Sequence, residues 1–80
     1  TEERRKEIVK LAGKYCEECR IGIRNIRRDA MDEVKNKEKN KEISKDEMFE
    51  HSENIQKLTD EFIAQVDSLF EEKEKDILTI

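Results

Sequence analysis

Proline is absent from this 80-residue chain, glycine occurs only twice, and aromatic residues make up 5% of it. Proline interrupts helices, and each glycine weakens a helix by about 1 kcal/mol relative to alanine, so their scarcity favours long helices. Charged residues make up 48% of the chain and the mean hydropathy is −1.04. So polar a composition leaves little apolar surface for a core, and it is compatible with one domain at most.

The groups needed for several kinds of chemistry are also scarce. No apolar run approaches the roughly 18 residues of a membrane span. His51 is the only histidine, and Cys16 and Cys19 are the only cysteines, whereas a structural zinc site needs about four ligands. The two glycines are isolated, so no phosphate-binding loop is present. We therefore expect no enzyme active site, no cofactor, no metal and no membrane partner, and we interpret both cysteines as small apolar residues on a packing face.

The first half of the chain predicts one long helix. Thr1 is suited to cap it, and the acidic residues Glu2 and Glu3 oppose the positive end of the helix dipole. Apolar residues then recur at helical spacing, with one heptad position holding Val9, Cys16, Ile23 and Ala30, and another holding Ala12, Cys19 and Ile26. The periodicity disappears in KNKEKNKE at 35–42, which predicts a helix end near residues 37–39 and a loop.

A second long helix is predicted to begin at Lys45. Ser44 and Glu47 form an S-x-x-E capping box, and Ile43 and Met48 occupy the positions of a hydrophobic staple. The apolar stripe that follows is wide, which indicates contact with two neighbouring elements. It comprises Met48, Ile55, Leu58, Phe62, Val66 and Leu69, flanked by Phe49, Ile63, Phe70 and Ile77.

These elements predict an all-α fold, a long antiparallel helical hairpin of about residues 2–38 and 45–78. A hairpin of this composition cannot bury its wide stripe alone. We therefore expect it to be part of a larger helical bundle that is completed either by a third helix or by self-association of the chain.

Positive charge is concentrated at one end of the sequence. Residues 1–30 carry nine Lys and Arg against six Asp and Glu, a net charge of +3, whereas residues 31–80 carry eight against fifteen, a net −7. All six arginines lie within the first 28 residues, and four of them fall in RIGIRNIRRD at 20–29. Arginine binds phosphate oxygens with a planar, bidentate fork, so this stretch is the candidate contact surface for a polyanion.

Helical spacing places Arg20, Arg24 and Arg27 in one stripe, with Arg28 at its edge, and we expect the stripe to stay accessible beside the packing face. Three hypotheses remain open on spacing alone. The first is an RNA-binding protein whose arginines contact phosphates. The second is a helical interaction or oligomerisation module whose arginines pair with acids on a partner. The third, a CxxC metal site or an enzyme, is remote for the reasons given above.

Four segments carry a resemblance to a known family, ribosome recycling factor. They are RIGIRNIRRDA at 20–30, TEERRKE at 1–7, KEIS at 41–44 and IQKLTDEFI at 55–63, and they occur in register along essentially the whole chain. The chain departs from the family pattern at Cys16, Cys19 and Gly22, where alanine or another small residue is common. Those departures concern packing and leave the arginines in place.

The resemblance implies that residues 1–80 form a partial helical-bundle domain. In the family, a long three-helix bundle carries a small β/α/β domain inserted between its first and second helices. The present chain would then supply only the second and third bundle helices, which agrees with the absence of an initiator methionine and with the wide apolar stripe. A chain without the inserted domain is not expected to recycle ribosomes.

The resemblance also implies a function, partners and a site. The family acts in the cytoplasm of bacteria or in organelles as a non-enzymatic translation factor. With elongation factor G it splits the post-termination ribosome, and its bundle lies against large-subunit ribosomal RNA. The RNA-contacting arginines implied by the resemblance are Arg20, Arg24 and Arg28, together with Arg4 or Arg5 near the helix start. Arg27 is a further candidate because it lies in the same helical stripe.

Overall fold

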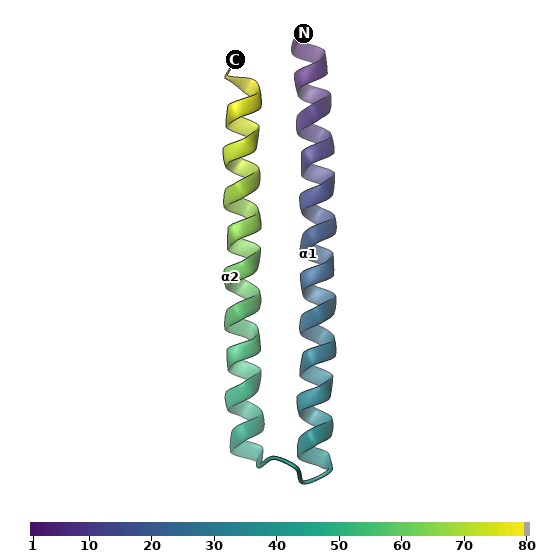
Figure 1. Cartoon of the computed structure of the whole chain (residues 1–80), viewed down its shortest axis with the longest axis vertical. Helices are drawn as coiled ribbons and strands as arrows, with labels where there is room; N and C mark the ends of the chain where they lie inside the picture. Colours follow the sequence, from purple (N-terminus) through teal and green to yellow (C-terminus); the bar gives the residue numbers. More distant parts are fainter. Residues whose placement is uncertain (80) are drawn as a thin grey trace.

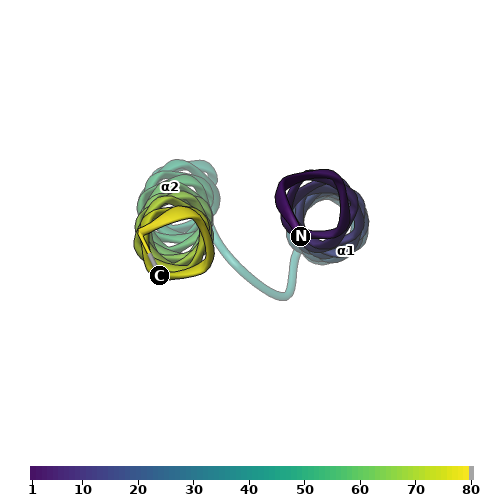
Figure 2. The ribbon, with the colours of Figure 1, turned by 90° about the horizontal axis from the view of Figure 1, so that it is seen from above.

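The chain folds as two long helices that run antiparallel to each other, joined by one short loop (Figure 1). A computed structural model describes residues 1–79 and defines α1 (Glu2–Lys39) and α2 (Lys45–Leu78). The molecule is 60 Å long, and an end-on view shows the two helices side by side in a single layer (Figure 2). The hairpin predicted for residues 2–38 and 45–78 is therefore confirmed.

Each helix begins at the cap that the sequence predicts. The hydroxyl of Thr1 accepts a hydrogen bond from the Arg4 amide at 3.4 Å. At the start of α2, Ser44 Oγ accepts from the Glu47 amide and Glu47 Oε1 accepts from the Ser44 amide, each at 3.0 Å. This reciprocal pair is the complete capping box, and it satisfies two backbone donors that a helix start leaves unpaired.

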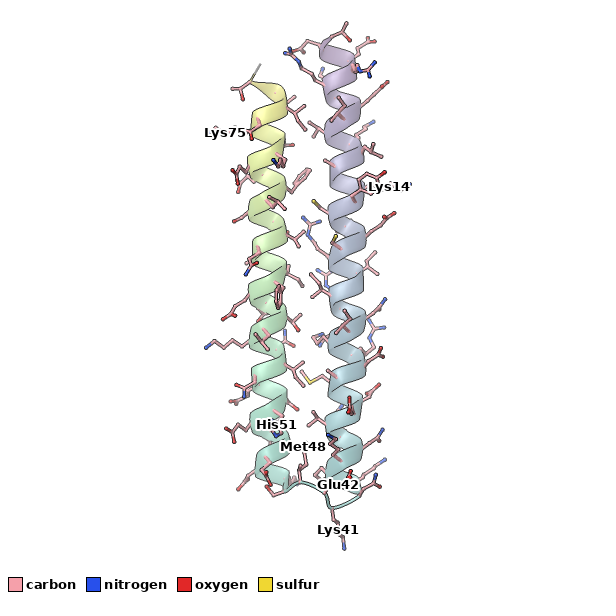
Figure 3. The ribbon with its side chains drawn as sticks, viewed as in Figure 1. Lys14, Lys41, Glu42, Met48, His51 and Lys75 are labelled. Carbon is pink, nitrogen blue, oxygen red and sulfur yellow. The ribbon has the colours of Figure 1, made fainter. Side chains whose placement is uncertain are left out.

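The loop reverses the chain by ending α1 in a left-handed residue. Lys41 has φ 61°, its amide donates to the Glu38 carbonyl at 3.0 Å, and the Glu42 amide donates to the Lys37 carbonyl at 2.9 Å. This pair of bonds is a Schellman motif, in which the left-handed position is more commonly glycine. The Lys41 side chain projects away from both helices at the tip of the hairpin (Figure 3).

The helices meet along one stripe from each. Half-buried residues on α1 include Val9, Cys16, Ile23 and Ala30, which share one predicted heptad position, and also Val34. Those on α2 include Met48, Ile55, Ile63, Val66, Phe70 and Ile77. Figure 3 shows Met48 directed toward α1, whereas Lys14 projects away from α2. Gly13 lies against Phe70, and a Cβ added there would be in ordinary van der Waals contact with the Phe70 ring at 3.5 Å.

This contact does not enclose a core. Thr59 is the only buried residue among those described, and its hydroxyl is satisfied by the Ile55 carbonyl at 2.7 Å. The hairpin exposes 6585 Å², whereas a compact monomer of its 9.6 kDa would expose about 5,100 Å². The excess of roughly 1,500 Å² on this one chain is about twice the roughly 800 Å² that each partner buries in a standard protein–protein interface.

The wide stripe predicted on α2 divides into two parts. Ile55 and Val66 face α1, but Leu58, Phe62 and Leu69 from the same predicted stripe remain about half exposed. Cys19 on α1 is likewise exposed, so its assignment to the face that packs within the hairpin was wrong, whereas Cys16 is half-buried there. A single neighbouring helix covers only one stripe, and the second part of the apolar surface therefore stays open.

The capping box makes α2 sensitive to acid. Hydrogen bonds from the Ser44 amide and hydroxyl lower the pKa of Glu47 below its usual value of 4.5. Because the pKa is lower in the folded chain, the stabilisation is present above the unfolded value and is lost as the pH falls through the folded one.

We expect wild type and Glu47→Gln to respond differently to acid, because Gln keeps the box but does not ionise. The difference between their melting temperatures, measured by circular dichroism at one fixed chain concentration, should shrink between pH 6 and pH 3. Ser44→Ala should lower the free energy of unfolding by about 1 kcal/mol at neutral pH, because the cap is lost. A difference between wild type and Glu47→Gln that does not change with pH would contradict this account.

Candidate nucleic-acid interface

The arginines at 20–28 fall into two environments, according to where α1 turns them. Arg24 and Arg28 are exposed on the outside of α1, whereas Arg20 and Arg27 are half-buried beside α2. The expectation that the whole stripe is accessible is therefore wrong for Arg20 and Arg27. The reason is that α2 is close enough for its polar residues to reach two of the four guanidinium groups.

Arg20 joins the two helices. Its Nε donates to Asp67 Oδ1 at 2.7 Å and its Nη1 donates to Glu17 Oε2 at 3.0 Å, and its side chain is only 17% exposed. The hydrogen bond to Asp67 raises the pKa of Arg20 above its usual value, in the direction expected for a cation held by carboxylates. Arg20 thus contributes to the alignment of α1 with α2.

Arg27 makes a second, weaker link between the helices. Its Nη1 donates to Gln56 Oε1 at 3.4 Å, and Gln56 Nε2 donates in turn to Asp60 Oδ1 at 2.9 Å. The neutral Gln56 amide at that distance holds the guanidinium only loosely, so Arg27 can turn toward an anion at little cost in free energy.

Arg24 and Arg28 form the outward part of the surface. The side chain of Arg24 is 46% exposed, and its closest acidic group is Glu17 Oε1, 3.8 Å from Nη1. Arg28 is exposed, and no ion pair involves it among residues 1–79. Ile21, three residues before Arg24 and seven before Arg28, adds an exposed apolar residue to the same face.

Arg4 and Arg5 lie near the beginning of α1, about 19 residues before Arg24. At 1.5 Å per residue they are roughly 30 Å from the main group. Arg4 is exposed and Arg5 is half-buried. The structure therefore does not bring these two arginines together with Arg24 and Arg28, and they form a separate positive region on the same helix.

An apolar groove lies on the other side of the hairpin. Its cavity of about 410 Å³ lies between the helices and is lined by Ile23, Ile26, Arg27, Ala30, Ile55, Leu58, Thr59 and Phe62. Ile26 is 70% exposed and lies two residues from both Arg24 and Arg28, which is about 200° around a helix. A segment that fills the groove would leave Arg24 and Arg28 uncovered.

Exposed apolar residues extend beyond the groove along α1 toward its first residues, and a second hollow lies toward the loop. Ile8, Tyr15 and Ile26 follow one another at helical spacing, as do Leu58, Phe62 and Leu69, and all six are exposed. Toward the loop, a second hollow is lined in part by Glu33, Lys37 and His51. His51 itself is exposed, as its position in the first turns of α2 suggests.

The described residues carry no metal-binding cluster and no membrane-spanning helix. Within residues 1–79 no group of three or more His, Cys, Asp or Glu side chains is arranged to hold a metal ion. Neither helix contains a stretch that is long and apolar enough to cross a membrane, over the part of the chain that the structure describes. Cys16 and Cys19 are both free thiols.

Sequence reasoning missed the residues of α2 that hold the arginines. Asp67 and Gln56 carry no motif of their own, and each looks like an ordinary polar residue on a solvated helix. The available signal was the antiparallel pairing itself, since a hairpin that turns at residues 40–44 places residue 20 near residue 67 and residue 27 near residue 56. Applying that register would have indicated acids beside Arg20.

Comparison with known proteins identifies the family of the chain. The family model for ribosome recycling factor matches residues 1–78. Over the whole chain, the ribosome-recycling factor of Brevibacillus brevis is 61% identical, that of Nostoc punctiforme 56% and that of Bacillus subtilis 50%. The chain spans 43–44% of the length of these relatives. With two long helices, a match over 78 residues and relatives of this similarity, the chain belongs to the ribosome recycling factor family.

Proposed function

We propose that this chain is the ribosomal-RNA-binding part of a cytoplasmic, non-enzymatic ribosome recycling factor. In the full-length protein, acting with elongation factor G, it would help to dissociate the post-termination ribosome. The observation that carries the proposal is the exposure of Arg24 and Arg28 on the side opposite the apolar groove, in a chain that is acidic as a whole. Such a surface attracts a polyanion locally although the net charge is −4.

Arg24, Arg27 and Arg28 are the proposed phosphate contacts. Arg24 and Arg28 are exposed, and Arg27 is held only by its bond to Gln56. Arg4 and Arg5 would make a second contact about 30 Å away, as an elongated RNA surface permits. Arg20 contributes to RNA binding indirectly, by aligning α1 with α2. A phosphate would have to displace both Asp67 and Glu17 to reach it.

The apolar groove is the proposed docking site for a preceding helix of the same domain. The excess exposed area of about 1,500 Å² fits one further helix, and the relatives are more than twice as long as this chain. On this proposal residues 1–80 are a partial helical-bundle domain. In the chain alone, the same surface would be covered by a second copy.

The arginine surface can be tested by the salt dependence of binding. The protein for this test is a hybrid factor, in which these 80 residues replace the aligned segment of the Brevibacillus brevis factor. Each phosphate contact adds about 0.7–0.9 to the slope of log K against log salt. We expect Arg24→Gln to lower the slope for the large ribosomal subunit by about that amount, and Arg28→Gln to do the same, with no loss of helicity.

Lys73→Gln is the matched control, because it removes one positive charge from the acidic part of α2. It should change the slope by much less than Arg24→Gln. An unchanged slope in both arginine variants would count against the proposed function.

The groove can be tested by the size of the isolated chain in solution. At tens of micromolar we expect sedimentation equilibrium to show a dimer, and Phe62→Glu to shift it toward monomer with loss of helicity, because a charge then lies in the apolar contact. Phe49→Glu is the control, since Phe49 is equally exposed, 54% against 52%, but does not line the groove.

In the hybrid factor, where a preceding helix would fill the groove, the protein should be monomeric and Phe62→Glu should lower its melting temperature. A folded, strictly monomeric isolated chain would contradict the proposed role of the groove. Equal effects of the two phenylalanine variants would also contradict it.

A further inference from the structure

One carboxylate is shared between a half-buried and an exposed arginine. Glu17 Oε2 lies 3.0 Å from Arg20 Nη1, and Glu17 Oε1 lies 3.8 Å from Arg24 Nη1. Two oxygens of one anion that face two guanidinium groups have the arrangement that a phosphate group takes between arginines. Glu17 therefore occupies, in the free protein, a position that suits an incoming phosphate.

Glu17 is kept in this position by a fixed neighbour. Arg20 is bound on its other side by Asp67 at 2.7 Å and is only 17% exposed, so it has little freedom to follow Glu17 away from the site. Glu17 and Arg24, by contrast, are 53% and 46% exposed. The exposed ion pair between Glu17 and Arg24 is therefore weaker than the pair between Arg20 and Asp67, and a phosphate can take the place of Glu17 beside Arg24.

We propose that Glu17 is a built-in competitor for phosphate at Arg24, an inference that rests on the proposed function. A phosphate cannot bind Arg24 at this position while the carboxylate remains there, because two anions would then lie side by side. Glu17 must turn away first, and that cost lowers the affinity for every polyanion. Additional contacts with Arg28 or Arg27 offset the free energy of moving Glu17 away. Glu17 therefore favours binding of an RNA surface that contacts several arginines over binding of an isolated phosphate.

Glu17 could instead support RNA binding, and the direction of the change in RNA affinity on its removal distinguishes the two roles. If Glu17 served to hold Arg24 in its binding orientation, its removal would weaken RNA binding. If it competes, its removal strengthens RNA binding. The matched control is Glu18→Gln, which changes the net charge equally at the adjacent, exposed position, and no ion pair involves Glu18 among residues 1–79.

The experiment measures binding of the large ribosomal subunit by the hybrid factor carrying Glu17→Gln or Glu18→Gln, each with and without Arg24→Gln. Circular dichroism checks that every variant is folded. We expect Glu17→Gln to tighten binding about two- to fivefold, the range that corresponds to an exposed ion pair. Glu18→Gln should give less than half of that gain. With Arg24→Gln in place, the two glutamate variants should no longer differ.

Two other results would overturn the inference in different ways. If Arg24→Gln weakens binding but Glu17→Gln only matches Glu18→Gln, or weakens binding, the competitor role is wrong and the proposed function stands. If Arg24→Gln and Arg28→Gln both leave the affinity and its salt slope unchanged, the proposed function fails and the competitor role fails with it.

Discussion

Two helices in contact can cover only one stripe of each other, and this constraint shapes the rest of the molecule. The apolar residues of α1 and α2 occupy more than one stripe, so a second apolar surface remains open around Ile26, Leu58 and Phe62. The absence of a buried apolar core among residues 1–79 follows directly. Packing against another element is therefore needed for substantial stability, since most helical stability in proteins comes from such contacts.

The same geometry separates the apolar side from the charged side. Because Ile26 in the groove lies about 200° from Arg24 and Arg28 on α1, the groove and these two outward arginines do not compete. Arg27, which lines the groove, lies at the boundary between the two sides. Between them, the contact of Arg20 with Asp67 holds the helices in register. The hairpin thus keeps the outward arginines on a rigid element, which suits a contact that must fit one particular surface.

Local signals predicted the helices well. Ser44 and Glu47 specified the start of α2 through hydrogen bonds between residues three apart, and the heptad residues Val9, Cys16 and Ile23 specified the face that packs. The end of α1 was less clear, because Lys41 adopts a left-handed conformation without the glycine that usually marks it. Helix starts, helix ends and packing stripes depend on residues that are close together in the chain, so they can be predicted from the sequence.

The site was predicted less completely, because it depends on contacts between residues far apart in the chain. The arginines could be identified, but their separation into outward and half-buried groups depends on Asp67 and Gln56, which lie 47 and 29 residues away from Arg20 and Arg27. A helical wheel of α1 alone does not show which part of its charged face α2 will reach. The open groove, likewise, follows from how many neighbours the hairpin has.

The central claim is that the arginine side of the hairpin meets ribosomal RNA while the groove side is covered by protein. A photo-activatable cross-linking residue at Ile21 or at Leu58 of the hybrid factor, irradiated on the large ribosomal subunit, tests it most directly. The account predicts cross-links to ribosomal RNA from position 21, and from position 58 only cross-links within the factor itself. Cross-links to RNA from position 58 and none from position 21 would contradict it.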